Sequence, residues 1–129
     1  MPILKDPNLE ARWIAELRSG KYKKCLYRLQ HTDRNGEVYY SASGVLLTLI
    51  ITNPEIAAKY SILSLQNGHD SASVREFLIT KLNKLFYNIR DLVWVEELND
   101  KHCLSFDTIA FLIENDSLYG GRETELELP

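Results

Sequence analysis

The residues best suited to chemistry in this sequence form a basic run near the N-terminus. Its cations are Arg18, Lys21, Lys23, Lys24 and Arg28, which fall within eleven residues that contain no acid. Tyrosines are interleaved with them, and further tyrosines follow on the segment expected to pair with the run. Guanidinium and ammonium groups beside aromatic faces suit a phosphate with an attached base. The pattern therefore predicts a site for a small, nucleotide-like anion, made by Arg18, Lys21, Tyr22, Lys24, Arg28 and Tyr39.

A simpler interpretation of the same run stays open. Lysines between a helix and a hairpin can merely solvate a connection, while the tyrosines fill the core. The net charge of -3 conceals a charge of +3 over residues 1–40, +2 over 41–90 and -8 over 91–129. The basic and acidic parts can face each other or a dimer mate, or the basic part can hold an anion.

Other kinds of chemical site are not indicated. His102 and Cys103 are neighbours, but the remaining histidines and cysteine do not fall at close ligand spacing, so we expect no metal and no cofactor. No local motif brings together a nucleophile, a base and an orienting acid, and no Walker loop or dinucleotide fingerprint is present. The N-terminus shows no secretion signal, so Cys25 and Cys103 are expected to be reduced thiols in the cytoplasm.

Two elements must position the basic run. Asp6 and the proline after it predict the start of a helix over residues 7–19, whose apolar residues recur at helical spacing. Gly20 is a natural left-handed stop. Alternating residues from 24 to 31, a turn at 33–36 and a returning strand to residue 41 predict a β-hairpin.

The middle of the chain should supply the core. The most apolar run follows Ser43, the expected N-cap, and predicts a central buried helix. A short helix over 54–59 follows. Residues 60–65 suit either a strand or an irregular segment.

A long helix is then expected from about residue 71, capped by Asp70, Ser71 or Ser73, with an apolar stripe that fades near residue 98. Ser105 should cap the final helix. The residues that we expect to be buried together are Trp13, Leu17, Val45, Leu46, Leu49, Phe77, Leu85, Phe106, Ile109 and Ile113.

These elements predict a single α+β domain over residues 1–115. Its small antiparallel sheet is built on the hairpin at about 24–41, with four or five packed helices around it. Residues 116–129 form an acidic tail, which is either frayed or added to the sheet as an edge strand. A chain of 129 residues is close to the commonest domain size.

Aromatic residues near the acidic end suggest a surface for a protein partner. These are Phe86, Tyr87, Trp94 and Tyr119, although Phe86 and Trp94 are better explained as core residues. A homodimer is left open, since two-fold self-association is the commonest assembly. No segment is long and apolar enough to suggest a membrane partner. Duplex nucleic acid is disfavoured by the isoelectric point of 5.6 and the acidic last third.

Three blocks of sequence carry a resemblance. They are Trp13-Ile14-Ala15-Glu16-Leu17-Arg18-Ser19-Gly20-Lys21-Tyr22-Lys23, then Gly44-Val45-Leu46, then Leu98-Asn99-Asp100 with Ser105-Phe106, Ile109-Ala110 and Ile113-Glu114. In type, spacing and order they resemble an uncharacterised family of small phage- and prophage-associated proteins. That family tends to carry three cysteines around its Gly-Val-Leu, where this chain has Ser41, Ala42 and Leu47, so no metal or thiol role transfers. The resemblance implies an intracellular, phage-associated accessory protein.

We therefore expect a protein that is not an enzyme. It should bind a host factor or a small anionic, nucleotide-like ligand without catalysis. The alternative is a small hydrolase or transferase acting on a nucleotide. Convergent carboxylates and a histidine around one cleft would favour the enzyme, whereas a basic aromatic pocket without them would favour binding.

Overall fold

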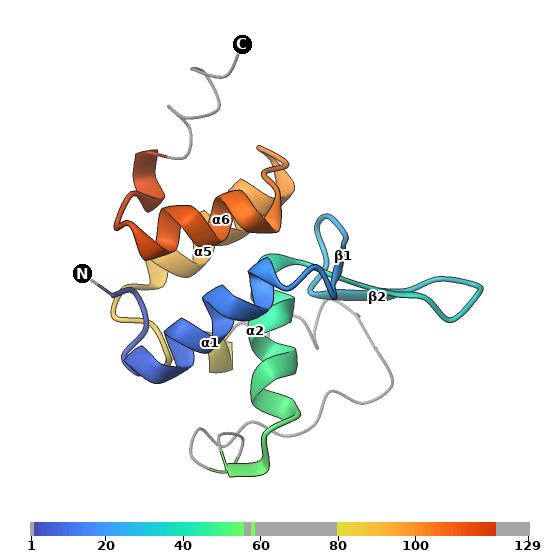
Figure 1. Ribbon diagram of the computed structural model, residues 1–129, viewed down its shortest axis with the longest axis horizontal. Coiled ribbons are helices and arrows are strands. Elements are labelled where there is room, and N and C mark those ends of the chain that lie inside the picture. The colour runs from blue at the N-terminus through green and yellow to red at the C-terminus, as the bar shows by residue number, and fades with distance from the viewer. Residues whose placement is uncertain (1, 56–57, 59–79, 121–129) are drawn as a thin grey trace.

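The structure, a computed structural model, describes residues 2–55, 58 and 80–120. Its elements are α1 (Pro7–Arg18), β1 (Lys23–Lys24), β2 (Gln30–Thr32), β3 (Val38–Tyr40), α2 (Ala42–Ile51), α5 (Ile89–Asp100), α6 (Phe106–Glu114) and the 3-10 helix η1 (Leu118–Gly120). Helix α1 packs on α6 and α2, while α5 lies against α2 and α6. Figure 1 shows the β2–β3 hairpin projecting away from these helices. The predicted α+β class is confirmed.

Helix α1 begins where the sequence predicts and ends one residue earlier. The Asp6 carboxylate accepts hydrogen bonds from the first two free backbone N–H groups at 3.0 and 3.2 Å, so it caps the helix. Gly20 adopts a φ of +77° just after the helix. On the buried face, the indole of Trp13 donates a 3.0 Å hydrogen bond to the carbonyl of Ala42. This bond fixes α1 against the first turn of α2.

The sheet is a short hairpin with one added strand. Strands β2 and β3 are antiparallel, and their turn at 33–36 is the predicted one. Strand β1 pairs with β3 in parallel, which makes the sheet mixed and places β3 in its centre. The prediction of one continuous first strand is wrong over residues 25–29. The N–H of Cys25 still donates to the carbonyl of Tyr40, but this segment, which we call the 25–29 loop, then leaves the sheet, because the carbonyl of Cys25 and the N–H of Tyr27 bond to α5.

Helix α2 is the buried centre of the fold, as predicted. Every residue from 42 to 47 is buried. The expected N-cap was wrong: Ser41, and not Ser43, accepts the hydrogen bond from the N–H of Gly44 at 3.1 Å. Gly44 itself lies against the 25–29 loop, because a Cβ built there would come within 1.8 Å of the carbonyl oxygen of Leu29. A side chain at this position would collide with backbone.

The predicted long helix is broken between residues 84 and 88. Phe86 forms a β-bridge with Leu4 near the N-terminus. Two backbone hydrogen bonds flank the bridge. The N–H of Lys5 donates to the carbonyl of Leu85 at 2.8 Å, and the N–H of Tyr87 donates to the carbonyl of Ile3 at 3.0 Å. Backbone groups bonded in this way cannot join a helical ladder.

The break changes which face of the next helix is buried. Asn88 caps α5 by accepting a hydrogen bond from the N–H of Arg90 at 3.0 Å. The apolar periodicity of the residues before the break therefore does not continue in register into α5. Ile89 and Val93, which the predicted stripe placed inside, are 55% and 51% exposed. Ile89 and Val93 therefore form an exposed apolar strip on α5.

The hydrophobic core joins α1, α2, α5 and α6. Of the ten residues expected to be buried together, eight are: Trp13, Leu17, Val45, Leu46, Leu49, Leu85, Ile109 and Ile113. Phe106 is half-buried against the core, and Phe77 lies outside the described residues. The rings of Trp13 and Phe86 meet edge to face with their centroids 6.1 Å apart.

Helix α6 starts at the predicted cap, Ser105, whose hydroxyl accepts from the N–H of Thr108 at 3.1 Å. After α6, Leu118 is buried and its carbonyl accepts a 2.7 Å hydrogen bond from the indole of Trp94. The first residues of the predicted acidic tail therefore pack on α5. Several predicted segments lie outside the described residues. They are the segment at 60–65, the part of the long helix from 71 to 79, most of the short helix at 54–59, and the tail from residue 121.

Candidate functional site

Two cations of the predicted anion site, Arg18 and Lys21, are paired with separate acids. Arg18 forms two 2.9 Å hydrogen bonds with Glu114 of α6, and this carboxylate raises the pKa of the guanidinium. Lys21 lies 3.3 Å from Glu16. The basic N-terminal part thus faces the acidic C-terminal part at Arg18, which is the simpler interpretation of the charge asymmetry.

The remaining predicted residues also lie apart. Lys24 donates to the carbonyl of Leu104, and burial lowers the pKa of its ammonium group. Arg28 lies 3.2 Å from the ring of His31. Tyr39 donates to Asp33 at 3.1 Å, and this hydrogen bond raises the pKa of its phenol.

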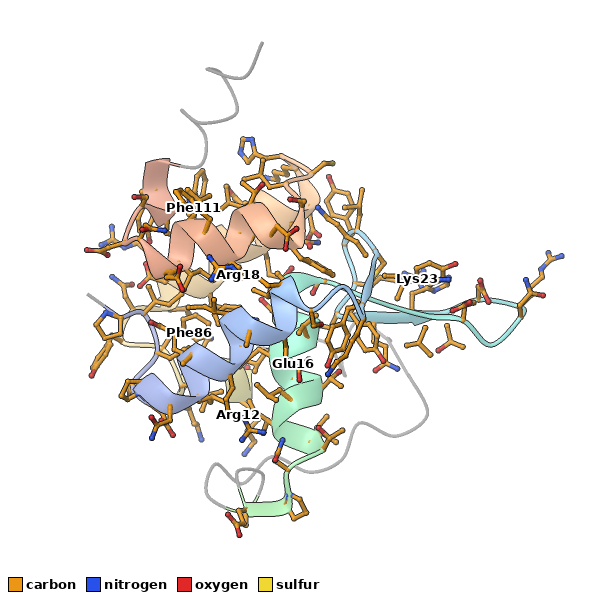
Figure 2. All side chains as sticks on the ribbon, in the orientation of Figure 1. Arg12, Glu16, Arg18, Lys23, Phe86 and Phe111 are labelled. Carbon is orange, nitrogen blue, oxygen red and sulfur yellow. The ribbon has the colours of Figure 1, made fainter. Side chains whose placement is uncertain are left out.

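Tyr22 contributes to packing instead of to an open site. Its ring meets that of Tyr40 edge to face at 5.1 Å. Burial, together with Glu16, raises the pKa of Tyr22 to about 12. Of the six predicted residues, Lys21 borders a cavity of about 330 Å³, which it shares with Arg12 and Glu16. Figure 2 shows Arg18 beside α6 and Lys23 on the sheet, on separate parts of the surface.

Anion binding by these residues stays a prediction that calorimetry tests. Nucleotide binding should weaken about ten- to a hundredfold in Arg28→Ala, because a charge-assisted hydrogen bond contributes about 1.5–3 kcal/mol. The double variant Lys21→Ala/Arg28→Ala should nearly abolish it. Arg90→Ala, at an exposed position of α5 outside the predicted set, is the control. Mono-, di- and cyclic nucleotides at low and moderate salt form the panel, and binding that survives the double change removes this site.

A better-formed site lies between the 25–29 loop and α5. It is a groove with a volume of about 260 Å³, which we call the α5 groove. Tyr27, Leu92 and Val93 supply apolar surface. Glu96, Glu97, Asp100 and Lys101 line the rest. Tyr27 is 57% exposed and Val93 is 51% exposed, so an aromatic ring and a branched aliphatic side chain border the groove in contact with solvent.

Tyr27 has an unusual backbone conformation. Its φ is +62°, in the left-handed region that disfavours side chains bearing a Cβ. Cys103 and Asp116 also have positive φ, but each closes a helix. After Asp116, the N–H of Ser117 reaches back to the carbonyl of Leu112 at 2.9 Å, as in an ordinary helix C-terminus. Tyr27 follows no helix, so a helix ending does not explain its strain.

Buried polar groups of α5 hold Tyr27 in place. Asp100, 7% exposed, accepts a 2.9 Å hydrogen bond from the N–H of Tyr27. Asn99 is fully buried, and its amide donates to the carbonyl of Cys25 at 3.0 Å and to Asp100 at 2.7 Å. Its oxygen accepts from the N–H of Ala42 at 3.2 Å. The loop is therefore fixed to α5 and α2 together.

Glu96 completes this polar layer one turn earlier. Its carboxylate accepts a 3.1 Å hydrogen bond from the hydroxyl of Ser41, the N-cap of α2. A carboxylate is favourable at a helix N-terminus because the free N–H groups there carry partial positive charge. Glu96, Asn99 and Asp100 share one face of α5, as residues three and four apart do.

The aromatic residues predicted to form a partner surface are divided. Phe86 belongs to the core, and half-buried Trp94 stacks on Tyr119 with ring centroids 5.9 Å apart. Tyr87 and Tyr119 are exposed and border a second cavity of about 420 Å³ with Asp91. Tyr119 donates to Asp91 at 2.5 Å, and burial together with this bond raises the pKa of Tyr119 to about 12.

Neither metal chemistry nor a spanning helix is indicated in the part of the chain that the structure describes. Across residues 2–55 and 80–120, no three His, Cys, Asp or Glu side chains are arranged to hold a metal ion. Among the same residues, no helix combines the length and apolarity needed to cross a membrane. Cys25 and Cys103 are both thiols.

Sequence reasoning missed the α5 groove for two reasons. Tyr27 was placed inside a strand, and the break before α5 hid the exposure of Val93. The signal that could have found it was the pair Asn99-Asp100, two polar residues directly after an apolar stripe. No protein family, curated protein or solved structure matches this chain, so the interpretation of the groove rests on its own residues.

Proposed function

We propose that this protein acts without catalysis, by binding another protein through the α5 groove. The observation that carries the proposal is Tyr27, an exposed aromatic residue held in a strained conformation by a buried carboxylate. Strain of this kind costs free energy and is concentrated at functional sites. Tyrosine is also among the residues that dominate binding energy at protein interfaces.

The surroundings of Tyr27 support the same function. Its backbone is fixed by Asp100, so binding does not have to order the backbone that carries the ring. Val93 borders the same groove, and Ile89 lies one turn away on the same face of α5. All three side chains are more than half exposed. An exposed aromatic and aliphatic strip beside a groove is typical of a protein-binding surface.

The enzymatic alternative is less well supported. It required carboxylates and a histidine around one cleft. The α5 groove contains carboxylates, but neither His31 nor His102 lines it. His31 lies near Tyr39 on the hairpin, and His102 packs on Trp94. Among the described residues that line the groove, the acids that could act as a general base include Glu96 and Asp100, which accept hydrogen bonds that hold the fold.

The biological setting that we propose is the cytoplasm of a bacterial cell, where a phage-associated accessory protein would capture a host factor. The support is the resemblance of the Trp13–Lys23 block and the Leu98–Asp100 block to that family. The second block includes Asn99 and Asp100, which fix the 25–29 loop, so a family motif coincides with the support of the groove.

Site-specific photocrosslinking tests the proposed function. A benzophenone amino acid at Val93, in the protein expressed in its natural host, should give a discrete protein adduct. The same amino acid at Phe111 of α6, which is 55% exposed, is the matched control and should give none. The Val93 adduct should disappear when Tyr27→Gly is added. Adducts that are absent at Val93, or equal at both positions, would rule out the groove as the binding surface.

The strain at Tyr27 predicts an unusual pair of stabilities. Tyr27→Gly should have a free energy of unfolding about 1 kcal/mol higher than Tyr27→Ala, because glycine adopts positive φ without the penalty that a Cβ causes. Both variants should lose the Val93 adduct. Chemical denaturation measures the difference. Equal stability of the two variants would mean that Tyr27 is not strained and would remove the observation on which the proposed function rests.

A further inference from the structure

We infer that the partner segment bound in the α5 groove carries a basic side chain, arginine or lysine, whose charged end lies against Glu97 and whose stem lies on Tyr27. The inference rests on the proposed function and names the chemistry of the partner.

The apolar part of the groove suits the stem of such a residue. Tyr27 and Val93 border the groove, while Leu92, 1% exposed, contributes apolar surface at its base. Lysine and arginine side chains pack their methylene groups along apolar surface while their charged ends stay near water. The face of a tyrosine ring also attracts a cation.

The polar part of the groove has the complementary charge. Glu97 lies at the rim with its side chain 35% exposed, and Glu96 and Asp100 lie deeper. One cation, Lys101, belongs to the lining, and its ammonium is 3.6 Å from Glu97. This contact is solvent-exposed and therefore weak, so an incoming guanidinium can replace or join it. Lys24, near Asp100, is already bound to the carbonyl of Leu104.

The charge of helices α5 and α6 also favours a basic partner. Helices α5 and α6 contain one basic residue, Arg90, and six acidic ones: Asp91, Glu96, Glu97, Asp100, Asp107 and Glu114. Glu114 is paired with Arg18 by two hydrogen bonds, and Glu97 lies 3.6 Å from Lys101, so acidic side chains still outnumber basic ones by six to three when Arg18 and Lys101 are counted with Arg90. A surface with this field attracts a cationic partner and repels an anionic one, which increases the association rate and favours a basic segment.

Three small probes of one shape test the inference without the natural partner. Benzamidinium combines an aromatic ring with an amidine cation, benzamide is its neutral counterpart, and benzoate is the anion. In two-dimensional ¹⁵N–¹H NMR titrations of the full chain, benzamidinium should shift the amides of Tyr27, Val93 and Glu97 together. Benzamide should bind about five- to tenfold more weakly, because it lacks the positive charge that Glu97 attracts. Benzoate should cause no shifts of these amides, because its negative charge is repelled.

Two variants assign the effect to the groove. Glu97→Gln should weaken benzamidinium binding about fivefold. Asp107→Asn, at an exposed position of α6 outside the groove, should leave this binding unchanged. Equal binding of the three probes, or benzamidinium shifts confined to other residues, overturns the inference. A dimer of the free protein that is lost in Val93→Asp, shown by sedimentation, also overturns it in favour of a second copy. Failure of the probes with an intact Val93 adduct rejects the basic side chain alone, whereas loss of the adduct rejects the proposed function.

Discussion

Replacing Gly44 by alanine is expected to lower the free energy of unfolding by about 3 kcal/mol, because the new methyl group would overpack a rigid contact. Its Cβ would come within 1.8 Å of the carbonyl oxygen of Leu29, which is backbone and cannot rotate away. That carbonyl also accepts a 3.1 Å hydrogen bond from the N–H of Ser41. Relieving the collision therefore requires the 25–29 loop or the first turn of α2 to move. Alanine would otherwise favour a helical position by about 1 kcal/mol.

The control for this change is Gly36→Ala in the hairpin turn. Gly36 has a φ of +82°, and nothing lies within 4 Å of a Cβ built there. Alanine should cost about 1–2 kcal/mol at this position, through backbone strain without collision. Chemical denaturation of both variants separates the two causes. A Gly44→Ala protein as stable as the wild type would show that the loop does not lie on α2 as described.

The elements predicted from local signals are those that the structure confirms. Asp6 and Ser105 cap their helices, and the turn at 33–36 closes the hairpin, since each signal acts within a few residues. The uniform apolarity of α2 also predicted its burial. Such features depend on hydrogen bonds and periodicity that are written in neighbouring positions.

The errors arose where distant segments compete for the same backbone groups. Nothing near Phe86 marks a break, because the cause is its pairing with Leu4, more than eighty residues away. The 25–29 loop alternates like a strand, yet Asn99 and Asp100 take its backbone groups from the sheet. The pairing of Arg18 with Glu114 of α6 likewise could not be read from the charges next to Arg18 in the sequence. Long-range partners of this kind are not encoded in local pattern.

Removing the side-chain amide of Asn99 is the second change that is expected to lower the free energy of unfolding strongly. In Asn99→Ala, the N–H of Ala42 and the carbonyl of Cys25 lose their buried partner. Each unsatisfied group costs about 1–3 kcal/mol, so the free energy of unfolding should fall by about 2–6 kcal/mol. The loop should also lose its fixed position, so the Val93 adduct and the benzamidinium shifts should weaken in the folded fraction. A structural role confined to the core would leave both of these unchanged.

In the isosteric variant Asn99→Asp, the free energy of unfolding should depend on pH. This variant keeps the acceptor for Ala42 but replaces the 2.7 Å hydrogen bond to Asp100 with two adjacent buried carboxyl groups. Like charges so close raise the pKa with which the pair titrates in the folded protein above its unfolded value. The folded state then binds more protons than the unfolded state, so stability falls as pH rises through this range. Asn99→Asp should therefore be less stable than the wild type at neutral pH and should recover part of the loss near about pH 5. Asn99→Ala should show no such recovery relative to the wild type. Parallel pH profiles for the two variants, measured by thermal unfolding, would mean that residue 99 does not contact Asp100.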